Sequence, residues 1–152
     1  MYYDVVVLSG GFDPMHVGHL RMIQESAKMA EIVIVGVNSD EWLMRKKGYI
    51  FMPHDERVEM VQGTRGVSKA MTFDDDDNSA CDLLRQDSAF LPNFKVTYAN
   101  GGSRTFDNIP EIPVAEELGV HLIWGVGGGK IQSSSDLVDG LVGTNVRMYK
   151  EK

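Results

Sequence analysis

Cysteine is almost absent from the sequence, which has only Cys81 among its 152 residues. One thiol cannot close an internal disulfide, so a disulfide-rich extracellular scaffold is excluded and a cytoplasmic protein is expected. Long apolar runs are also missing, since none approaches the roughly 18 residues that a membrane-spanning helix needs. The first residues, Met1–Asp4, lack the basic start of a signal peptide. We therefore expect a soluble protein with no membrane partner.

Positive charge is scarce as well, with 15 Lys and Arg residues against 22 Asp and Glu residues and a net charge of -7. Affinity for nucleic acid depends on clustered Lys and Arg side chains that displace counterions, so no nucleic-acid partner is expected. An acidic chain that binds a polyphosphate must gather cations, glycines and helix N-termini at one place. Such a cluster is therefore the feature to look for.

Short strand-like runs alternate with amphipathic stretches along the chain. The runs at 5–8 and 32–35 are β-branched and too short for helices, and they predict buried strands on either side of a helix over His16–Ala30. Further strands are predicted over 67–73, 94–99 and 120–124, and further helices over 53–61, 80–85, 114–118 and 134–142. The alternation predicts an α/β fold in one domain, 1–152, with a doubly wound, parallel, five-stranded sheet and helices on both faces. Ligands are expected beyond the carboxyl ends of the strands.

The turn between the first strand and the first helix carries unusual chemistry. The paired glycines Gly10 and Gly11 let the backbone approach a ligand closely. Asp13 is expected to cap the helix, with Pro14 at its first position. The sequence thus predicts a helix N-terminus that opens directly onto the ligand edge of the sheet.

Two histidines, His16 and His19, lie three positions apart and share one face at the start of this helix. A helix N-terminus presents unpaired N–H groups and a partial positive charge, and imidazole donors beside it suit a phosphate whose charge rises during reaction. For either residue alone, an exposed histidine in a tight turn is the simpler interpretation. A structural zinc site is not expected, because no Cys or further His stands at ligand spacing. The combined pattern favours a phosphoryl-handling site.

The residues Gly11-Phe12-Asp13 and His16-Val17-Gly18-His19 resemble the signature of the cytidylyltransferase-like nucleotidylyltransferase superfamily. The resemblance implies a Rossmann-like domain in which His16 and His19 contact a nucleoside triphosphate and stabilise the transition state. It also implies a homodimer. The residues that it places around the nucleotide in this turn are Gly10, Gly11, Phe12, Asp13 and Gly18.

A second segment, Ile131-Gln132-Ser133-Ser134-Ser135, resembles the family's Ile-Ser-Ser/Thr-Ser/Thr motif with one residue inserted. Its three hydroxyls can cap a helix and donate to phosphate oxygens, and Lys130 supplies a point charge for departing pyrophosphate. Taken alone, the segment is a well-capped helix start. The run Gly127–Gly129 lacks the Gly-Lys-Ser/Thr ending of a phosphate loop, so we expect a hinge there.

Other residues at the same edge resemble the family more weakly. Mobile lysines after the second strand often reach the phosphates in relatives, so Lys46 or Lys47 is a candidate, although a charged run in a loop is usually solvated. Arg104 has two interpretations. Its planar guanidinium can donate to a phosphate, or it is an exposed arginine in a loop. Ser103 stands where relatives often have an acid. Whatever that acid contributes to recognition of the acceptor or the base is therefore in doubt here. The remaining weak matches are Asn38-Ser39-Asp40 and Glu56-Arg57.

Two further features favour structural interpretations. The acidic tract Asp74–Asp77 lacks the alternating spacing of a calcium loop, so it is expected to be a solvated loop whose end helps to cap the next helix. Trp42 and Trp124 are expected to pack in the protein rather than to stack on a ligand.

These features together predict an enzyme, a nucleotidylyltransferase that transfers CMP from CTP to a sugar or polyol phosphate and releases pyrophosphate. An adenylyltransferase that uses ATP and a nucleotide-binding sensor without turnover are the alternatives. No general base is needed, because a phosphate monoester with a second pKa of about 6 is already largely anionic. Mg²⁺ is expected as a cofactor bound mainly through the nucleotide phosphates, without a metal site of the protein's own.

Overall fold

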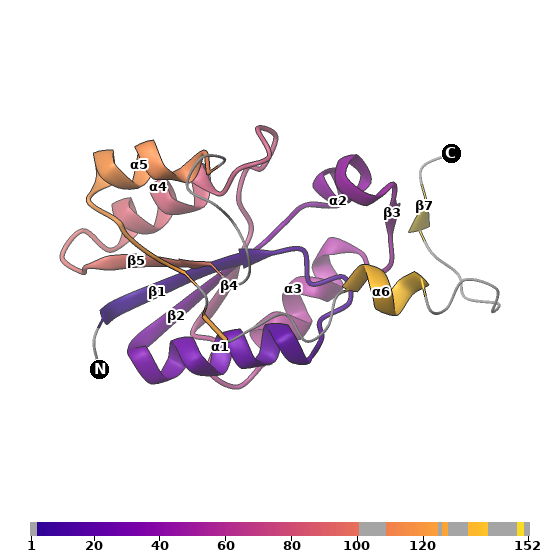
Figure 1. The fold of residues 1–152 in the computed structure, drawn as a ribbon, viewed down its shortest axis with the longest axis horizontal. Coiled ribbons are helices and arrows are strands. Elements are labelled where there is room, and N and C mark those ends of the chain that lie inside the picture. Colours follow the sequence, from indigo (N-terminus) through magenta and orange to yellow (C-terminus); the bar gives the residue numbers. More distant parts are fainter. Residues whose placement is uncertain (1–2, 101–108, 125, 128–133, 140–148, 151–152) are drawn as a thin grey trace.

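The computed structural model describes residues 3–100, 109–124, 126–127, 134–139 and 149–150. Its centre is a parallel sheet with strand order β4-β2-β1-β5-β6 (Figure 1). The strands are β1 (Tyr3–Gly10), β2 (Ala30–Val37), β4 (Lys69–Met71), β5 (Val96–Asn100) and β6 (His121–Trp124). The chain passes from β1 to β2 and β4, and then crosses to the other side of β1 for β5 and β6. The predicted doubly wound, five-stranded sheet is confirmed.

Helices cover both faces of the sheet, as the sequence predicts (Figure 1). They are α1 (Val17–Met29) and α3 (His54–Gln62) on one face, and α4 (Cys81–Phe90) and α5 (Glu111–Leu118) on the other. Side chains of β1 alternate between the two faces. Val6 and Leu8 belong to the core under α1 and α3, whereas Val5 and Val7 belong to the core under α4 and α5. Because β1 is buried on both faces, its sequence is a continuous apolar run.

Smaller elements gather beyond the carboxyl ends of the strands (Figure 1). They are α2 (Asp40–Lys47), β3 (Tyr49–Ile50), α6 (Ser134–Asp139) and β7 (Tyr149–Lys150). Strands β3 and β7 pair antiparallel in a sheet of their own. This edge is where a doubly wound sheet binds its ligands.

Helix α2 corrects the expectation that the basic run after the second strand lies in a loop. Ser39 caps the helix by accepting a hydrogen bond of 3.0 Å from the N–H of Trp42. Acidic residues occupy its first turn and basic residues its last, which complements the helix dipole. Within α2, Leu43 is the one side chain that is buried in the described structure. Sequence periodicity missed the helix because so little of its surface is apolar.

Element bounds differ from the predicted ones mainly at the ends. The strand predicted over 67–73 spans only Lys69–Met71, and the helix predicted from residue 80 extends to Phe90. The helix predicted over 134–142 is described as far as Asp139. No helix within the described part of the chain is both long enough and apolar enough to cross a bilayer.

Candidate active site

The turn after β1 ends in a pair of histidines that cap α1 reciprocally. His16 is the N-cap residue, and its Nδ1 accepts the N–H of Gly18 at 3.0 Å. In return the N–H of His16 donates to Nδ1 of His19 at 3.1 Å. This is a capping box in which imidazoles take the places that Ser and Glu usually occupy. The expectation that Asp13 caps this helix, with Pro14 in its first position, is wrong, because His16 already satisfies the first turn.

The two rings are held against each other and against the backbone. Their centroids are 3.8 Å apart in a stacked arrangement, and the ring of Phe12 lies 4.6 Å from that of His19. A Cβ added at Gly18 would lie 2.8 Å from Cε1 of His16, so any other residue there would displace the ring. Glycine between the histidines therefore allows the first ring to lie on the helix.

This arrangement fixes which ring nitrogen can donate. An acceptor nitrogen carries no proton, so a neutral ring that accepts through Nδ1 has its proton on Nε2. Burial is the main cause that lowers the pKa of His19 to about 3, and the charges of His16 and Lys47 lower it further. At neutral pH His19 is therefore an uncharged imidazole with an Nε2–H donor.

The carboxylate of Asp13 is directed away from the helix start. Its side chain is fully buried, and its oxygens accept the backbone N–H groups of Phe51 at 2.7 Å and Met52 at 2.6 Å. Asp13 therefore ties the histidine-bearing turn to the segment that precedes α3. A direct contact between Asp13 and a nucleotide stays a prediction.

The serine-rich segment meets the same turn. Ser134, the first residue of α6, is buried, and its Oγ donates to the carbonyl oxygen of Pro14 at 2.7 Å. Ser135 follows in α6. Three predicted residues, Ser133, Lys130 and Arg104, lie outside the described residues. The structure thus brings the two predicted halves of the site together through Ser134.

The two candidate lysines, Lys46 and Lys47, lie in the last turn of α2, and the charge of Lys47 acts on His19. Lys46 lies over the ring of Trp42, with Nζ 4.6 Å from the ring centroid. Lys47 is half-buried, and burial lowers its pKa while the charge of Asp13 opposes that shift. Its charge also lowers the pKa of His19. A nucleotide contact through Lys46 stays a prediction, and Lys47 joins the candidate site.

Trp42 packs against the turn, in agreement with its predicted role. A Cβ added at Gly11 would lie 3.3 Å from Cζ3 of Trp42 and 3.0 Å from Cδ2 of Leu43. Glycine at position 11 therefore lets α2 approach the turn closely. Gly127 serves in the same way on the other side, because a Cβ there would lie 3.0 Å from the backbone of Met22 in α1. Close packing thus accounts for Gly127, the described residue of the expected hinge.

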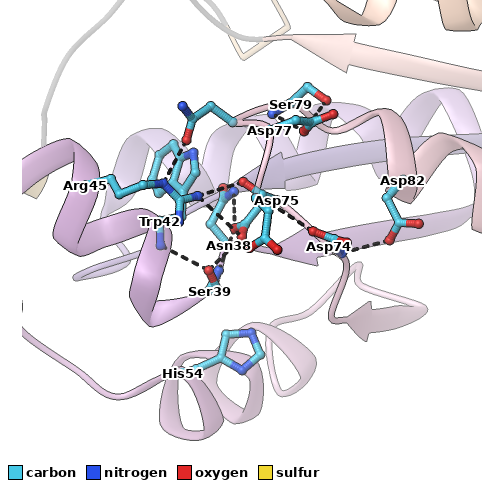
Figure 2. A network of polar contacts seen from close by, with 12 residues as sticks. Asn38, Ser39, Trp42, Arg45, His54, Asp74, Asp75, Asp77, Ser79 and Asp82 are labelled. Atoms are coloured by element: carbon cyan, nitrogen blue, oxygen red, sulfur yellow. Dashed lines mark hydrogen bonds and ion pairs between the residues drawn. The ribbon is translucent and has the colours of Figure 1, made fainter.

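The acidic tract contains one buried carboxylate that the sequence interpretation missed. Asp75 is only 2% exposed, and Figure 2 shows its carboxylate directed at the start of α2. It accepts Nδ2 of Asn38 at 3.0 Å, the N–H of Ser39 at 2.8 Å and the Oγ of Ser39 at 2.7 Å. Arg45 donates to the carbonyl oxygen of Asp75 at 2.7 Å. The expectation of a solvated tract is wrong at Asp75, because the helix N-terminus attracts this carboxylate.

Comparison with known proteins agrees with this geometry. The family model described as cytidylyltransferase-like matches residues 7–128, which include the second half of β1, the histidine-bearing turn and the other four strands of the parallel sheet. The chain belongs to the cytidylyltransferase-like family. The predicted enzyme class, a nucleotidyltransferase, is confirmed by this membership.

Several relatives are recognisable at low identity. A bifunctional protein HldE from Syntrophotalea carbinolica is 29% identical over 145 residues, which cover 93% of this chain and 26% of that protein. An ethanolamine-phosphate cytidylyltransferase from Arabidopsis thaliana is 33% identical over 67 residues, which cover 44% of this chain and 16% of that protein. The chain thus spans about a quarter of the length of the first of these relatives and less of the second.

The fold also matches solved structures. A bifunctional NMN adenylyltransferase/ADP ribose pyrophosphatase from Francisella tularensis superposes with a TM-score of 0.69 at 16% identity, over 95% of this chain and 44% of that one. At this identity the likeness concerns the fold alone. The Rossmann-like architecture expected from the sequence is confirmed.

Metal ligands are not gathered in the described part of this cytidylyltransferase-like chain. No three His, Cys, Asp or Glu side chains of the described residues are placed to hold an ion together. The oxygens of Asp13 already accept two backbone N–H groups. Imidazole N–H groups and a lysine suit phosphate oxygens rather than a bare cation. Mg²⁺ therefore stays a prediction, as an ion carried by the nucleotide phosphates.

Proposed function

We propose that this chain transfers a nucleoside monophosphate from a nucleoside triphosphate, CTP in the first instance, to a phosphorylated small molecule of the sugar or polyol phosphate type. The observation that carries the proposal is the histidine pair at the start of α1, fixed through its Nδ1 atoms. Cytoplasmic location and a homodimer remain predictions.

The site would bind the triphosphate by donating to its oxygens. Because Nδ1 of each ring accepts a backbone N–H, His16 and His19 would donate to phosphate through Nε2, beside the positive end of a 13-residue helix. Lys47 adds a half-buried cation, and Ser134 keeps α6 against the turn. Donors that are already oriented need no reorganisation when charge develops on the phosphate, which is the condition for strong transition-state stabilisation.

The chemistry then requires positioning rather than proton transfer. An anionic oxygen of the acceptor phosphate attacks the α-phosphorus and forms the new O–P bond. The bond between the α-phosphorus and the bridging oxygen breaks, and pyrophosphate leaves with that electron pair. Because the acceptor oxygen is already ionised at neutral pH, its second pKa being about 6, no protein base has to remove a proton. A neutral His19 with a pKa of about 3 fits the role of a hydrogen-bond donor and not that of a base.

Mg²⁺, held by phosphate oxygens, would neutralise part of the triphosphate charge when bound. The protein's own contribution is the oriented set of N–H donors described above. This division agrees with a turn whose buried carboxylate, Asp13, is already engaged by backbone N–H groups.

ATP is the second candidate nucleotide. The family name and the Arabidopsis thaliana relative favour CTP, whereas the Francisella tularensis structure with the same fold is named for an adenylyltransferase. The two histidines interact with phosphates in either case, so they do not select the base.

The test is a matrix of pyrophosphate release, with each common nucleoside triphosphate against a panel of sugar and polyol phosphates. Release with CTP and one class of acceptor, together with formation of the matching CMP conjugate, supports the proposal. Release with ATP alone supports the second candidate. Thermal stabilisation by a triphosphate without release from any pair would reject transfer and support a sensor.

A further inference from the structure

Arg57, in the first half of α3, connects four segments of the ligand edge. Its side chain is fully buried, and Nε donates to the carbonyl oxygen of Met52 at 2.9 Å. One terminal nitrogen, Nη1, donates to the carbonyl oxygens of Gly11 at 2.8 Å and Asn38 at 2.6 Å. The other, Nη2, forms an ion pair with Oδ1 of Asp40 at 2.7 Å. One guanidinium therefore holds the turns after β1 and β2, the start of α2 and the approach to α3.

Burial of this charge is an inefficient way to gain stability. An arginine loses its hydration when it is buried, and an apolar side chain of similar volume often gives equal or greater stability. Its single carboxylate partner in the described structure, Asp40, is itself about one-third exposed. A planar fork with fixed donor directions gives geometry that an apolar side chain cannot. The role of Arg57 therefore lies in the segments that it aligns.

Arg57 and Asp13 both hold the backbone of Met52. Asp13 accepts the N–H of Met52, and Arg57 donates to the carbonyl oxygen of Met52. Asp13 belongs to the histidine-bearing turn, and Arg57 also holds that turn through Gly11. The turn is thus fixed at two points, three and five residues before His16, and neither attachment uses a nitrogen of the histidine rings.

Lys47 interacts electrostatically with both Asp13 and Arg57. The charges of both Asp13 and Arg57 act on it, in opposite directions. Lys47 in turn acts on His19. The helix that carries Lys47 begins at Asp40, which Arg57 holds by the ion pair. The position of α2 relative to the histidine pair therefore depends on the guanidinium.

We propose, on the basis of the function proposed above, that Arg57 is a positioning residue for nucleotidyl transfer. It holds the histidine-bearing turn against α2, so that His19 and Lys47 are directed at the same phosphate group. Arg57 is fully buried, so it acts through these residues and not by contact with substrate. A purely structural role would lower the stability of the fold and leave the folded protein's site unchanged.

The test compares Arg57→Lys with Val120→Ala. Lysine keeps the charge but has three donors on one nitrogen, so it cannot reach all the acceptors of the guanidinium fork. Val120 is a buried core residue just before β6, in the core under α4 and α5 and outside the histidine-bearing turn, and its truncation destabilises the protein without touching Arg57 or its partners. Asp40→Asn is the milder second variant if Arg57→Lys does not fold, because it weakens the same ion pair at a partly exposed position.

The first readout is the ¹H–¹⁵N spectrum of the imidazole nitrogens in the free protein. In the wild type His19 should be a single Nε2–H tautomer with its depressed pKa. In Arg57→Lys it should become a mixture of tautomers that titrates closer to 6.5, the ordinary value. Val120→Ala should keep the wild-type spectrum. An unchanged His19 spectrum in folded Arg57→Lys, or the same change in both variants, overturns the proposal.

The second readout is steady-state kinetics of pyrophosphate release. A misplacement of about 1 Å can reduce the rate about 100-fold, so kcat of Arg57→Lys should fall by about that factor with a smaller change in the KM for triphosphate. Wild-type kcat in the folded variant contradicts the proposal. If the wild type itself releases no pyrophosphate from any pair, the proposed function fails, and the imidazole spectra alone decide the role of Arg57.

Discussion

Ser134 Oγ donates to the carbonyl oxygen of Pro14 at 2.7 Å, although 120 positions separate the two residues in the sequence. Ser134 begins α6, and Pro14 lies two residues before His16, the cap of α1. The bond therefore fixes the starts of two helices next to each other. Helix starts are where anions bind, so the contact places the serine-rich segment at the phosphate end of the proposed site.

Removal of this contact should weaken nucleotide binding more than it weakens the fold. Ser134→Ala loses one hydrogen bond, which is worth about 1 kcal/mol of unfolding free energy. We expect the KM for triphosphate to rise about ten-fold, equivalent to about 1.4 kcal/mol. Urea unfolding and steady-state kinetics measure the two effects.

Ser88→Ala is the matched control, because the buried hydroxyl of Ser88 has no hydrogen-bond partner among the described residues. Its loss should leave both quantities close to those of the wild type. An unchanged KM in Ser134→Ala would show that α6 does not contribute to triphosphate binding.

The pKa of His19 makes stability depend on pH. Burial and the charges of His16 and Lys47 lower this pKa from 6.5 to about 3. Between these values the unfolded chain binds a proton that the folded protein does not. The free energy of unfolding therefore rises with pH in this window, by up to about 1.4 kcal/mol per pH unit. The contribution of His19 to stability is therefore most favourable above pH 6.5, and it is lost as the pH falls from 6.5 to about 3.

Asp87 acts in the opposite direction. Burial raises its pKa from 3.8 to about 7, and its Oδ2 has no hydrogen-bond partner in the described part of the chain. Here the folded protein binds the extra proton, so stability falls as the pH rises from 3.8 to about 7. The two contributions oppose each other between 3.8 and 6.5.

Single variants should separate the two opposing pH dependences of the unfolding free energy. Relative to the wild type, His19→Gln should become less stable with rising pH across this window, and Asp87→Asn should become more stable. Urea unfolding at several pH values gives the slopes. Equal slopes in the wild type and both variants would contradict the assignment of these two buried groups.

Asp75 should be required for the placement of α2. An amide at this position would turn an N–H group toward donors from Asn38 and Ser39, so Asp75→Asn is expected to cost about 3 kcal/mol of unfolding free energy. Asp76→Asn, at the exposed neighbouring position, should cost almost nothing. Similar unfolding midpoints for the two variants would show that the buried network is dispensable.

The sheet and the histidine pair could be predicted from the sequence because their signals are local. The β-branched run in β1 is buried on both faces, and a strand of that kind shows as an unbroken apolar stretch. His16 and His19 stand out through their spacing at the start of an amphipathic helix. Their reciprocal capping could not be foreseen, because imidazoles are not the usual capping side chains.

Residues whose roles depend on distant partners could not be predicted. In the sequence Asp75 looks like one of several solvated acids. Only the folded chain brings it to the N-terminus of α2, where Ser39, 36 positions away, donates its N–H to the Asp75 carboxylate. Arg57 lies in a helix with polar neighbours, and only the folded chain brings the carbonyl oxygen of Gly11, 46 positions away, to its side chain. The sequence predicts a helix cap at Asp13 because α1 follows it directly, whereas its hydrogen-bond partners follow β3.

The most direct test of the account is the rate of nucleotidyl transfer by His16→Asn and His19→Asn, with His121→Asn as the control. Asparagine is a good helix cap, so it should keep α1 intact at position 16 while the Nε2–H donor is lost. His121 is exposed at the start of β6. We expect kcat to fall about 100- to 1,000-fold in each of the first two variants and to stay at the wild-type value in the control. Turnover near that of the wild type in both folded variants would contradict the claim that this histidine pair stabilises the transferring phosphate.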